Sequence, residues 1–174
     1  MLRTRLATAA VALPAIWLLV WKLPNDLFAG FIGTVTAVAL YEYFAMALPN
    51  HGPERGLGIV WGLLVAAGVI AGRPGFWGGS IAFAVISGFV FVLWRRDDLP
   101  GAVLRLGAAV LGVLYLGFFL PHMVLLRHEH VDGWRWCLFT VYVAMGSDTG
   151  GYFAGRAFGR TADQVVRERL RAAN

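Results

Sequence analysis

The sequence predicts an all-α protein, a polytopic bundle of about six transmembrane helices. Of its 174 residues, 59% are hydrophobic and only 14% are charged. The charged residues cluster between long apolar runs, which is typical of a multi-pass membrane protein. A soluble core does not need this much apolar length, so the composition excludes a soluble globular domain.

Six apolar segments are the expected membrane spans. They cover residues 6–21, 27–48, 57–72, 76–94 and 103–126, with a last stretch from about residue 136 into a glycine-rich segment. The first span competes with a secretory signal peptide, but Lys22-Leu23-Pro24-Asn25 lacks the small-residue cleavage pattern and further spans follow. Pro121 interrupts the fifth segment, where we expect it to kink the helix or to split off its end.

The basic residues predict that both termini are cytoplasmic. With the N-terminus inside, eleven arginines fall on the cytoplasmic side: Arg3, Arg5, Arg55, Arg95, Arg96, Arg105, Arg156, Arg160, Arg167, Arg169 and Arg171. Four basic residues fall outside: Lys22, Arg73, Arg127 and Arg135. Under the positive-inside rule, this asymmetry favours an N-in, C-in, multi-pass protein of the cell (inner) membrane. Arg105 and Arg156 lie close to or within spans and therefore weigh less in the count.

The net charge of +5 does not indicate a nucleic-acid partner. No basic stripe interleaved with exposed aromatic residues is present, and basic loops beside membrane spans explain the charge. The single cysteine, Cys137, excludes an intramolecular disulfide, and we expect it to be a small buried apolar residue.

Histidines do not predict a metal centre. His122 is alone in an apolar setting and is expected to be structural rather than a ligand. Residues 127–136 include His128, Glu129, His130 and Asp132, but their spacing fits no metal-ligand pattern well. A solvated interfacial loop with aromatic residues is the favoured interpretation.

The most informative stretch is residues 146–160, which read G-S-D-T-G-G-Y-F-A-G-R-A-F-G-R. As a helix, this stretch has two ridges about 100° apart: small residues at Ser147, Gly151, Gly155 and Gly159, and polar residues at Asp148, Tyr152, Arg156 and Arg160. A carboxylate at the centre of a membrane helix costs roughly 2.5–3.5 kcal/mol on insertion scales, so Asp148 is a functional candidate. The alternative is that Asp148 pairs with Arg156 or a neighbouring helix and only holds the bundle together.

Residues 148–160 resemble the D-T-G-A-Y-F-x-G-R-x-F-G-[KR] segment of the phosphatidate cytidylyltransferases, also called CDP-diacylglycerol synthases. The match has no gap and one Ala-to-Gly change, at Gly151. The resemblance implies an integral membrane enzyme that transfers CMP from CTP to phosphatidic acid, releases pyrophosphate and uses Mg²⁺.

The chemistry implied by this resemblance assigns roles to the two ridges. Nucleotidyl transfer moves negative charge between phosphate oxygens, so the site must supply cations. Asp148 is the expected catalytic residue and magnesium ligand. The expected substrate-binding residues are Arg156, Tyr152, Gly151, Gly155 and Arg160, with the two arginines on phosphates of CTP or phosphatidic acid. For Arg160, the favoured alternative to phosphate binding is that its side chain snorkels to the membrane interface. For most of the glycine ridge, the favoured alternative to ligand binding is ordinary helix packing.

The resemblance covers only the front portion of the family pattern. Family members continue with S-P-K-K-T-x-E-G and later S-x-x-K-R-x-x-x-K-D, which contributes a second carboxylate, and this chain has neither. Residues 1–160 are therefore expected to be a truncated cytidylyltransferase-like transmembrane domain, and residues 161–174 a polar basic tail. We expect this chain, as a fragment, frameshifted product or degenerate paralogue, to be inactive or strongly impaired by itself.

Two other classes of protein stay open. One is a non-catalytic membrane scaffold with Asp148 in a structural ion pair; the other is a small membrane transporter with Asp148 on an ion path. No inverted repeat or paired broken helix supports transport. Glu42 replaces the missing carboxylate only if the second span packs beside the sixth, and an interfacial position is favoured for it. A homodimer also stays open.

Overall fold

The computed structural model describes residues 14–94, 99–129 and 131–159. The elements are α2 (Asn25–Ala47), α3 (Gly52–Ile70), α4 (Pro74–Trp94), α5 (Leu99–Gly112), the π-helix η1 (Val113–Phe119), α6 (His122–Glu129) and α7 (Gly133–Phe158). Residues 14–22 are also helical. No strand occurs in the described ranges, and the all-α prediction is confirmed for them.

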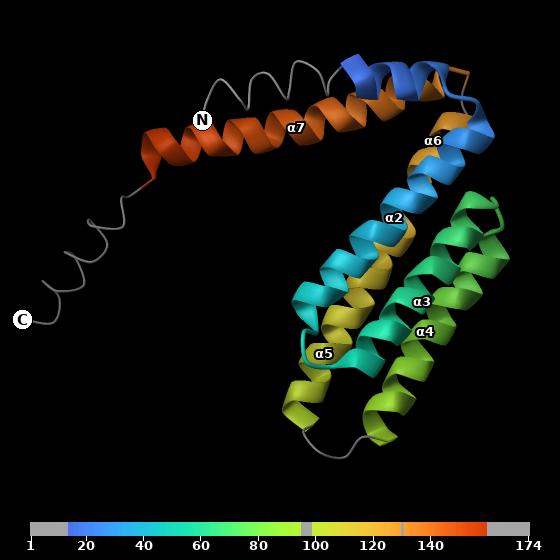
Figure 1. The fold of residues 1–174 in the computed structure, drawn as a ribbon, viewed down its shortest axis with the longest axis vertical. Helices are drawn as coiled ribbons and strands as arrows, with labels where there is room; N and C mark the ends of the chain where they lie inside the picture. Colours follow the sequence, from blue (N-terminus) through green and yellow to red (C-terminus); the bar gives the residue numbers. More distant parts are fainter. Residues whose placement is uncertain (1–13, 95–98, 130, 160–174) are drawn as a thin grey trace, which may run out of the picture. The chain divides into compact units, whose positions relative to one another are not determined.

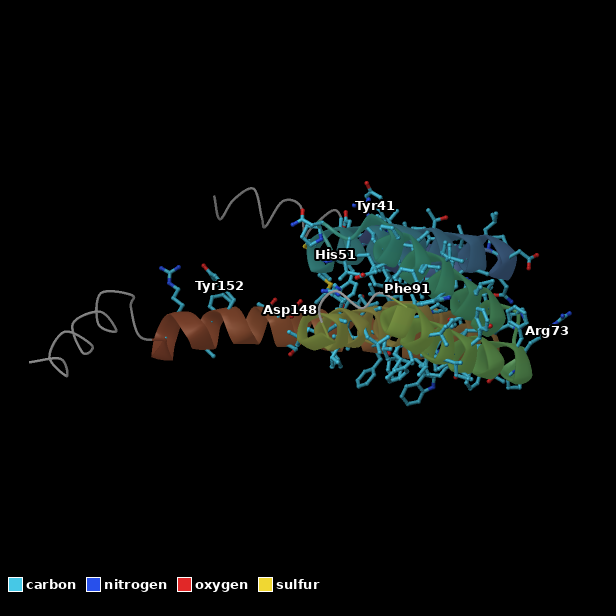
Figure 2. All side chains as sticks on the ribbon, turned by 90° about the horizontal axis from the view of Figure 1, so that it is seen from below. Tyr41, His51, Arg73, Phe91, Asp148 and Tyr152 are labelled. Carbon is cyan, nitrogen blue, oxygen red and sulfur yellow. The ribbon has the colours of Figure 1, made fainter. Side chains whose placement is uncertain are left out.

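The chain divides into two compact units, one ending at Cys137 and the other beginning at Leu138. In the first unit, α2, α3, α4 and the consecutive elements α5, η1 and α6 form a bundle (Figure 1). The central helix is α3, which packs against α4, η1 and α2. His51 and Arg73 lie at opposite ends of this bundle (Figure 2).

Four described segments are long and apolar enough to cross a membrane: Asn25–Ala47, Gly52–Ile70, Pro74–Phe91 and Gly101–Glu129. They correspond to the second, third, fourth and fifth predicted spans. Of the first predicted span, residues 14–21 are helical and residues 6–13 lie outside the described ranges. The total of six spans and the N-in, C-in orientation stay predictions.

The helices begin earlier than the apolar runs suggest. Helix α3 starts at Gly52 instead of residue 57, with Pro53 in its first turn, where a missing N–H costs no intrahelical hydrogen bond. Glu54 and Arg55 therefore belong to the helix and not to the preceding loop. The loop predicted over residues 127–136 is also shorter, because α6 continues to Glu129 and α7 starts at Gly133.

Pro121 splits the fifth span as the sequence predicts. Proline lacks an N–H, and its ring clashes with the carbonyl four residues earlier, so a regular α-helix cannot continue through it. The structure has the wider π-helix η1 before Pro121 and a turn at Leu120 and Pro121. The Nδ1–H of His122 donates to the carbonyl of Phe118 at 2.6 Å, which supports the structural interpretation of His122.

The bundle core consists of two apolar clusters. The larger is built from Trp61, Val65, Val69, Ala84 and Val113, and the other from Leu40, Phe44, Leu48 and Ala109. Helices α3 and η1 approach closely, since a Cβ placed on Gly117 would lie 2.7 Å from the carbonyl oxygen of Gly62. This contact requires glycine and sets the separation of the two helices.

Candidate functional site

The predicted site residues lie on α7, in the second compact unit. The helix is uninterrupted from Gly133 to Phe158, which confirms the helical spacing of both ridges as far as Gly155 and Arg156. The residue that follows the helix is Gly159, whose N–H donates to the carbonyl of Gly155 at 2.8 Å. A Cβ on Gly159 would collide with that same carbonyl oxygen, so the last residue of the small ridge is required to be glycine. Arg160 lies outside the described residues.

The polar ridge of α7 is exposed. Asp148, Tyr152 and Arg156 follow at intervals of four residues and are all exposed within their unit (Figure 2 labels the first two). Asp148 and Arg156 form no ion pair with any residue that the structure describes. They are eight residues apart, which is about 12 Å along a helix, too far for a direct pair. A structural Asp148–Arg156 bridge is therefore excluded within α7.

The neighbouring side chains satisfy their own polar groups or pack on each other. The hydroxyl of Thr149 donates to the carbonyl of Met145 at 2.8 Å, as serine and threonine commonly do inside helices. The rings of Tyr152 and Phe153 lie edge to face, with centroids 5.6 Å apart. Asp148 is exposed, one helical turn before this aromatic pair begins at Tyr152.

The ridge of small residues is open as well. A Cβ placed on Gly151 or Gly155 would meet no atom within 4 Å, and the same holds for Gly146 and Gly150. Small residues at a spacing of four let another helix or a ligand approach the backbone. The second unit therefore presents two adjacent uncovered ridges, one polar and one of small residues.

The first turn of α7 belongs to the bundle unit, and several contacts fix it there. The Sγ–H of Cys137 donates to the carbonyl of Met123 at 3.4 Å, and Cys137 is fully buried, as predicted. Trp134 packs against Trp21 with ring centroids 6.2 Å apart. Gly133 comes so close to the carbonyl of Leu126 that no side chain fits there.

No metal centre is found away from α7 in the described part of the chain. No group of three or more His, Cys, Asp or Glu residues is placed to hold a metal ion there. His128, Glu129 and Asp132 form no such group, and His130 lies outside the described residues. Glu42 is exposed near the end of α2 and is not part of the bundle core.

Sequence reasoning missed one charged pair inside the bundle. The Nε of Arg105 on α5 lies 3.0 Å from Oε2 of Glu54 on α3, and the two side chains are only 20% and 12% exposed. The pair borders a small cavity between α3, α4 and α5 that is also lined by Leu57, Trp61, Gly88, Phe91, Leu106 and Ala109. The residues are far apart in the sequence, and the only available signal was that Arg105 falls inside a predicted span, whereas Glu54 was expected in the loop before the third span.

Four apolar helices of spanning length, joined to a helix with an open polar face, define a multi-pass helical membrane protein. The sequence matches the model of the Cytidylyltransferase family over residues 3–166. The chain belongs to this family.

A phosphatidate cytidylyltransferase from Chlamydia pneumoniae is 31% identical over 145 residues, a match that covers 75% of this chain and 47% of that protein. The chain thus spans about half the length of this relative. No solved structure matches it.

Proposed function

We propose that this chain takes part in the transfer of CMP from CTP to phosphatidate, which gives CDP-diacylglycerol and pyrophosphate. Membership of the Cytidylyltransferase family supports nucleotidyl transfer, and the relative named phosphatidate cytidylyltransferase supports a lipid phosphate as the acceptor. Because the match covers 47% of that relative, the complete reaction is a proposal for this chain.

The observation that carries the proposal is the open polar face of α7. In the reaction, a phosphate oxygen of phosphatidate bonds to the α-phosphorus of CTP, and the bond from that phosphorus to the pyrophosphate oxygen breaks. Negative charge gathers on the oxygens around this phosphorus, and cationic groups stabilise it. Arg156 offers a guanidinium that suits phosphate oxygens, and Tyr152 offers a hydroxyl on the same face. Arg160 extends the same spacing beyond the described residues.

Asp148 is the residue that would hold Mg²⁺. It is the single acidic residue in the described part of the second unit, and its exposed carboxylate fits an ion that keeps several waters and binds through one or two carboxylates plus substrate phosphates. The ion would supply positive charge to the phosphates of CTP. The uncovered backbone at Gly151 and Gly155 leaves room for the substrate beside this carboxylate.

Equilibrium dialysis of radiolabelled CTP against the detergent-purified chain, with Mg²⁺ or with a chelator, tests the proposal. We expect CTP binding that depends on Mg²⁺, and a loss of about tenfold or more in Asp148→Asn, since a charge-assisted ligand is removed. Asp26→Asn is the matched control, because Asp26 is an exposed acid in the first turn of α2. Equal CTP binding by both variants would contradict the role of Asp148.

Thermal unfolding of the same variants separates the enzyme from a scaffold. If Asp148 served in a structural ion pair, Asp148→Asn would unfold at a lower temperature than the parent chain. If Asp148 is instead an exposed ligand of a bound cation, the unfolding temperature of Asp148→Asn should equal that of the parent chain in the absence of CTP and Mg²⁺.

A further inference from the structure

Three tryptophans form a stack of rings in the first compact unit. Trp17 and Trp21 lie one turn apart on the helix of residues 14–22, with ring centroids 4.9 Å apart. The ring of Trp21 lies 6.2 Å from that of Trp134 in the first turn of α7. We call these three residues the tryptophan ladder. It joins two helical segments that are far apart in the sequence.

The tryptophan ladder stands at the ends of two segments of membrane-spanning length. Trp21 shortly precedes the span Asn25–Ala47, and Trp134 shortly follows the span Gly101–Glu129. The two span ends lie together, because the guanidinium of Arg127 donates to a backbone carbonyl just before α2. Tryptophan is enriched at the ends of membrane spans, at the level of the lipid headgroups. The position of the ladder therefore indicates the boundary between hydrocarbon and water.

The indole N–H groups of the ladder have no acceptor among the residues that the structure describes. Trp17 and Trp21 are 37% and 40% exposed, and Trp134 is partly buried. The rings thus belong neither to the core nor to a fully exposed surface. An indole has a large apolar ring and one hydrogen-bond donor, so it suits a layer that is apolar on one side and rich in acceptors on the other.

Two cations lie over the faces of the ladder. The Nζ of Lys22 is 3.8 Å from the ring centroid of Trp21, and the guanidinium carbon of Arg135 is 5.2 Å from that of Trp134. Arg135 also pairs with Asp132 at 3.3 Å, whereas Lys22 forms no ion pair with any described residue. Ammonium and indole N–H groups on one surface favour phosphate and carbonyl oxygens as partners.

We propose that the tryptophan ladder and Lys22 form an anchor that binds the phosphodiester and ester carbonyl groups of bilayer phospholipids. Its ligand is the bulk lipid surface, so the anchor selects no particular headgroup and takes no part in substrate recognition. Because Trp134 lies in the first turn of α7, the anchor also fixes the membrane depth at which the helix with the motif begins. The inference does not depend on the proposed function.

Fluorine NMR of the full chain, labelled with fluorotryptophan in phospholipid nanodiscs, measures the depth of each ring. Single tryptophan-to-phenylalanine variants assign the signals. A nitroxide on the lipid headgroup and one at the end of the acyl chain are separated by about 15 Å, half of the hydrocarbon core. We expect the headgroup nitroxide to weaken the ladder signals more strongly than the chain-end nitroxide does. Trp61, which is buried halfway along α3, is the internal control and should show the reverse.

The same measurement distinguishes the lipid groups involved. We expect equal weakening of the ladder signals in phosphatidylcholine and in phosphatidylglycerol nanodiscs, because both lipids carry a phosphodiester and ester carbonyls. Weakening that occurs only in phosphatidylglycerol would overturn the assignment to groups that all phospholipids share. Ladder signals that the headgroup nitroxide does not weaken more than the chain-end nitroxide would overturn the interfacial position.

Trp21→Leu tests whether the ladder fixes the depth at which α7 begins. A nitroxide attached at Val131→Cys reports its depth through collisions with oxygen and with a water-soluble nickel complex, and Cys137 is fully buried and stays unlabelled. Leucine prefers hydrocarbon, so we expect the label to move toward the hydrocarbon core in Trp21→Leu. Its depth should stay unchanged in Phe31→Leu, a matched ring on α2 that is 42% exposed. Equal depths in the two variants would overturn the anchor, and if Trp21→Leu does not fold, the fluorine measurement decides.

Discussion

The contact between η1 and α3 makes a sharp prediction for Gly117→Ala. The new Cβ would lie 2.7 Å from the carbonyl oxygen and 2.9 Å from the Cα of Gly62. Ordinary van der Waals contact begins at 3.4 Å, so the two backbones must separate by about 0.7 Å (3.4 − 2.7). Because both neighbouring atoms belong to the backbone, no side-chain rotation relieves the overlap.

The expected cost follows from two opposing effects. Overpacking a tight contact costs about 1–3 kcal/mol. Alanine's better helix propensity offsets up to about 1 kcal/mol of this. We therefore expect Gly117→Ala to lower the free energy of unfolding by about 1–2 kcal/mol.

The matched control is Gly107→Ala on α5, where a Cβ would meet no atom within 4 Å. It keeps the propensity gain and has no overlap, so it should unfold at or slightly above the parent's midpoint. The assay is titration of the purified chain in mixed micelles with SDS, followed by far-UV circular dichroism. Equal midpoints for Gly117→Ala and Gly107→Ala would refute the close approach of η1 and α3.

Two further substitutions test polar groups in the bundle by the same titration. Arg127→Met removes a hydrogen bond to the carbonyl of Leu23 and a guanidinium 4.5 Å from the ring of Phe28. It should lower the free energy of unfolding by about 1–3 kcal/mol. An unchanged midpoint would show that this arginine does not connect α6 to α2. Glu54→Leu alone should lower the free energy of unfolding by about 3–5 kcal/mol, because it removes the carboxylate beside Arg105 in a largely buried site. The double variant Glu54→Leu with Arg105→Met should recover most of that loss. Additive losses would contradict a direct pair.

The apolar runs predicted the membrane-spanning part of the fold well. The second to fifth predicted spans correspond to four helical segments of spanning length. Pro121 was informative because the clash of its ring with the preceding turn is a local property of the chain. Helix starts were less predictable. Glu54 and Arg55 are polar, yet they belong to the first turn of α3, where Glu54 pairs with Arg105 of another helix.

Contacts between distant segments could not be predicted from the sequence. The approach of Gly117 to Gly62 and the pairing of Glu54 with Arg105 depend on how separate helices pack. No local pattern distinguishes these glycines from Gly107, where an added Cβ would meet no atom within 4 Å. The motif on α7 was different, because its function was inferred from a resemblance and from helical periodicity. The structure confirms the helix and leaves both ridges uncovered within their unit, while the roles of Asp148 and its neighbours stay predictions.

The central claim is that the carboxylate of Asp148 holds a divalent cation against nucleotide phosphates. Electron paramagnetic resonance of Mn²⁺, used in place of Mg²⁺, counts the ions that the chain binds with and without CTP. In the presence of CTP, we expect the parent chain and Asp26→Asn to bind Mn²⁺. We expect Asp148→Asn to leave Mn²⁺ free in solution. Equal Mn²⁺ binding by all three chains in the presence of CTP would contradict it.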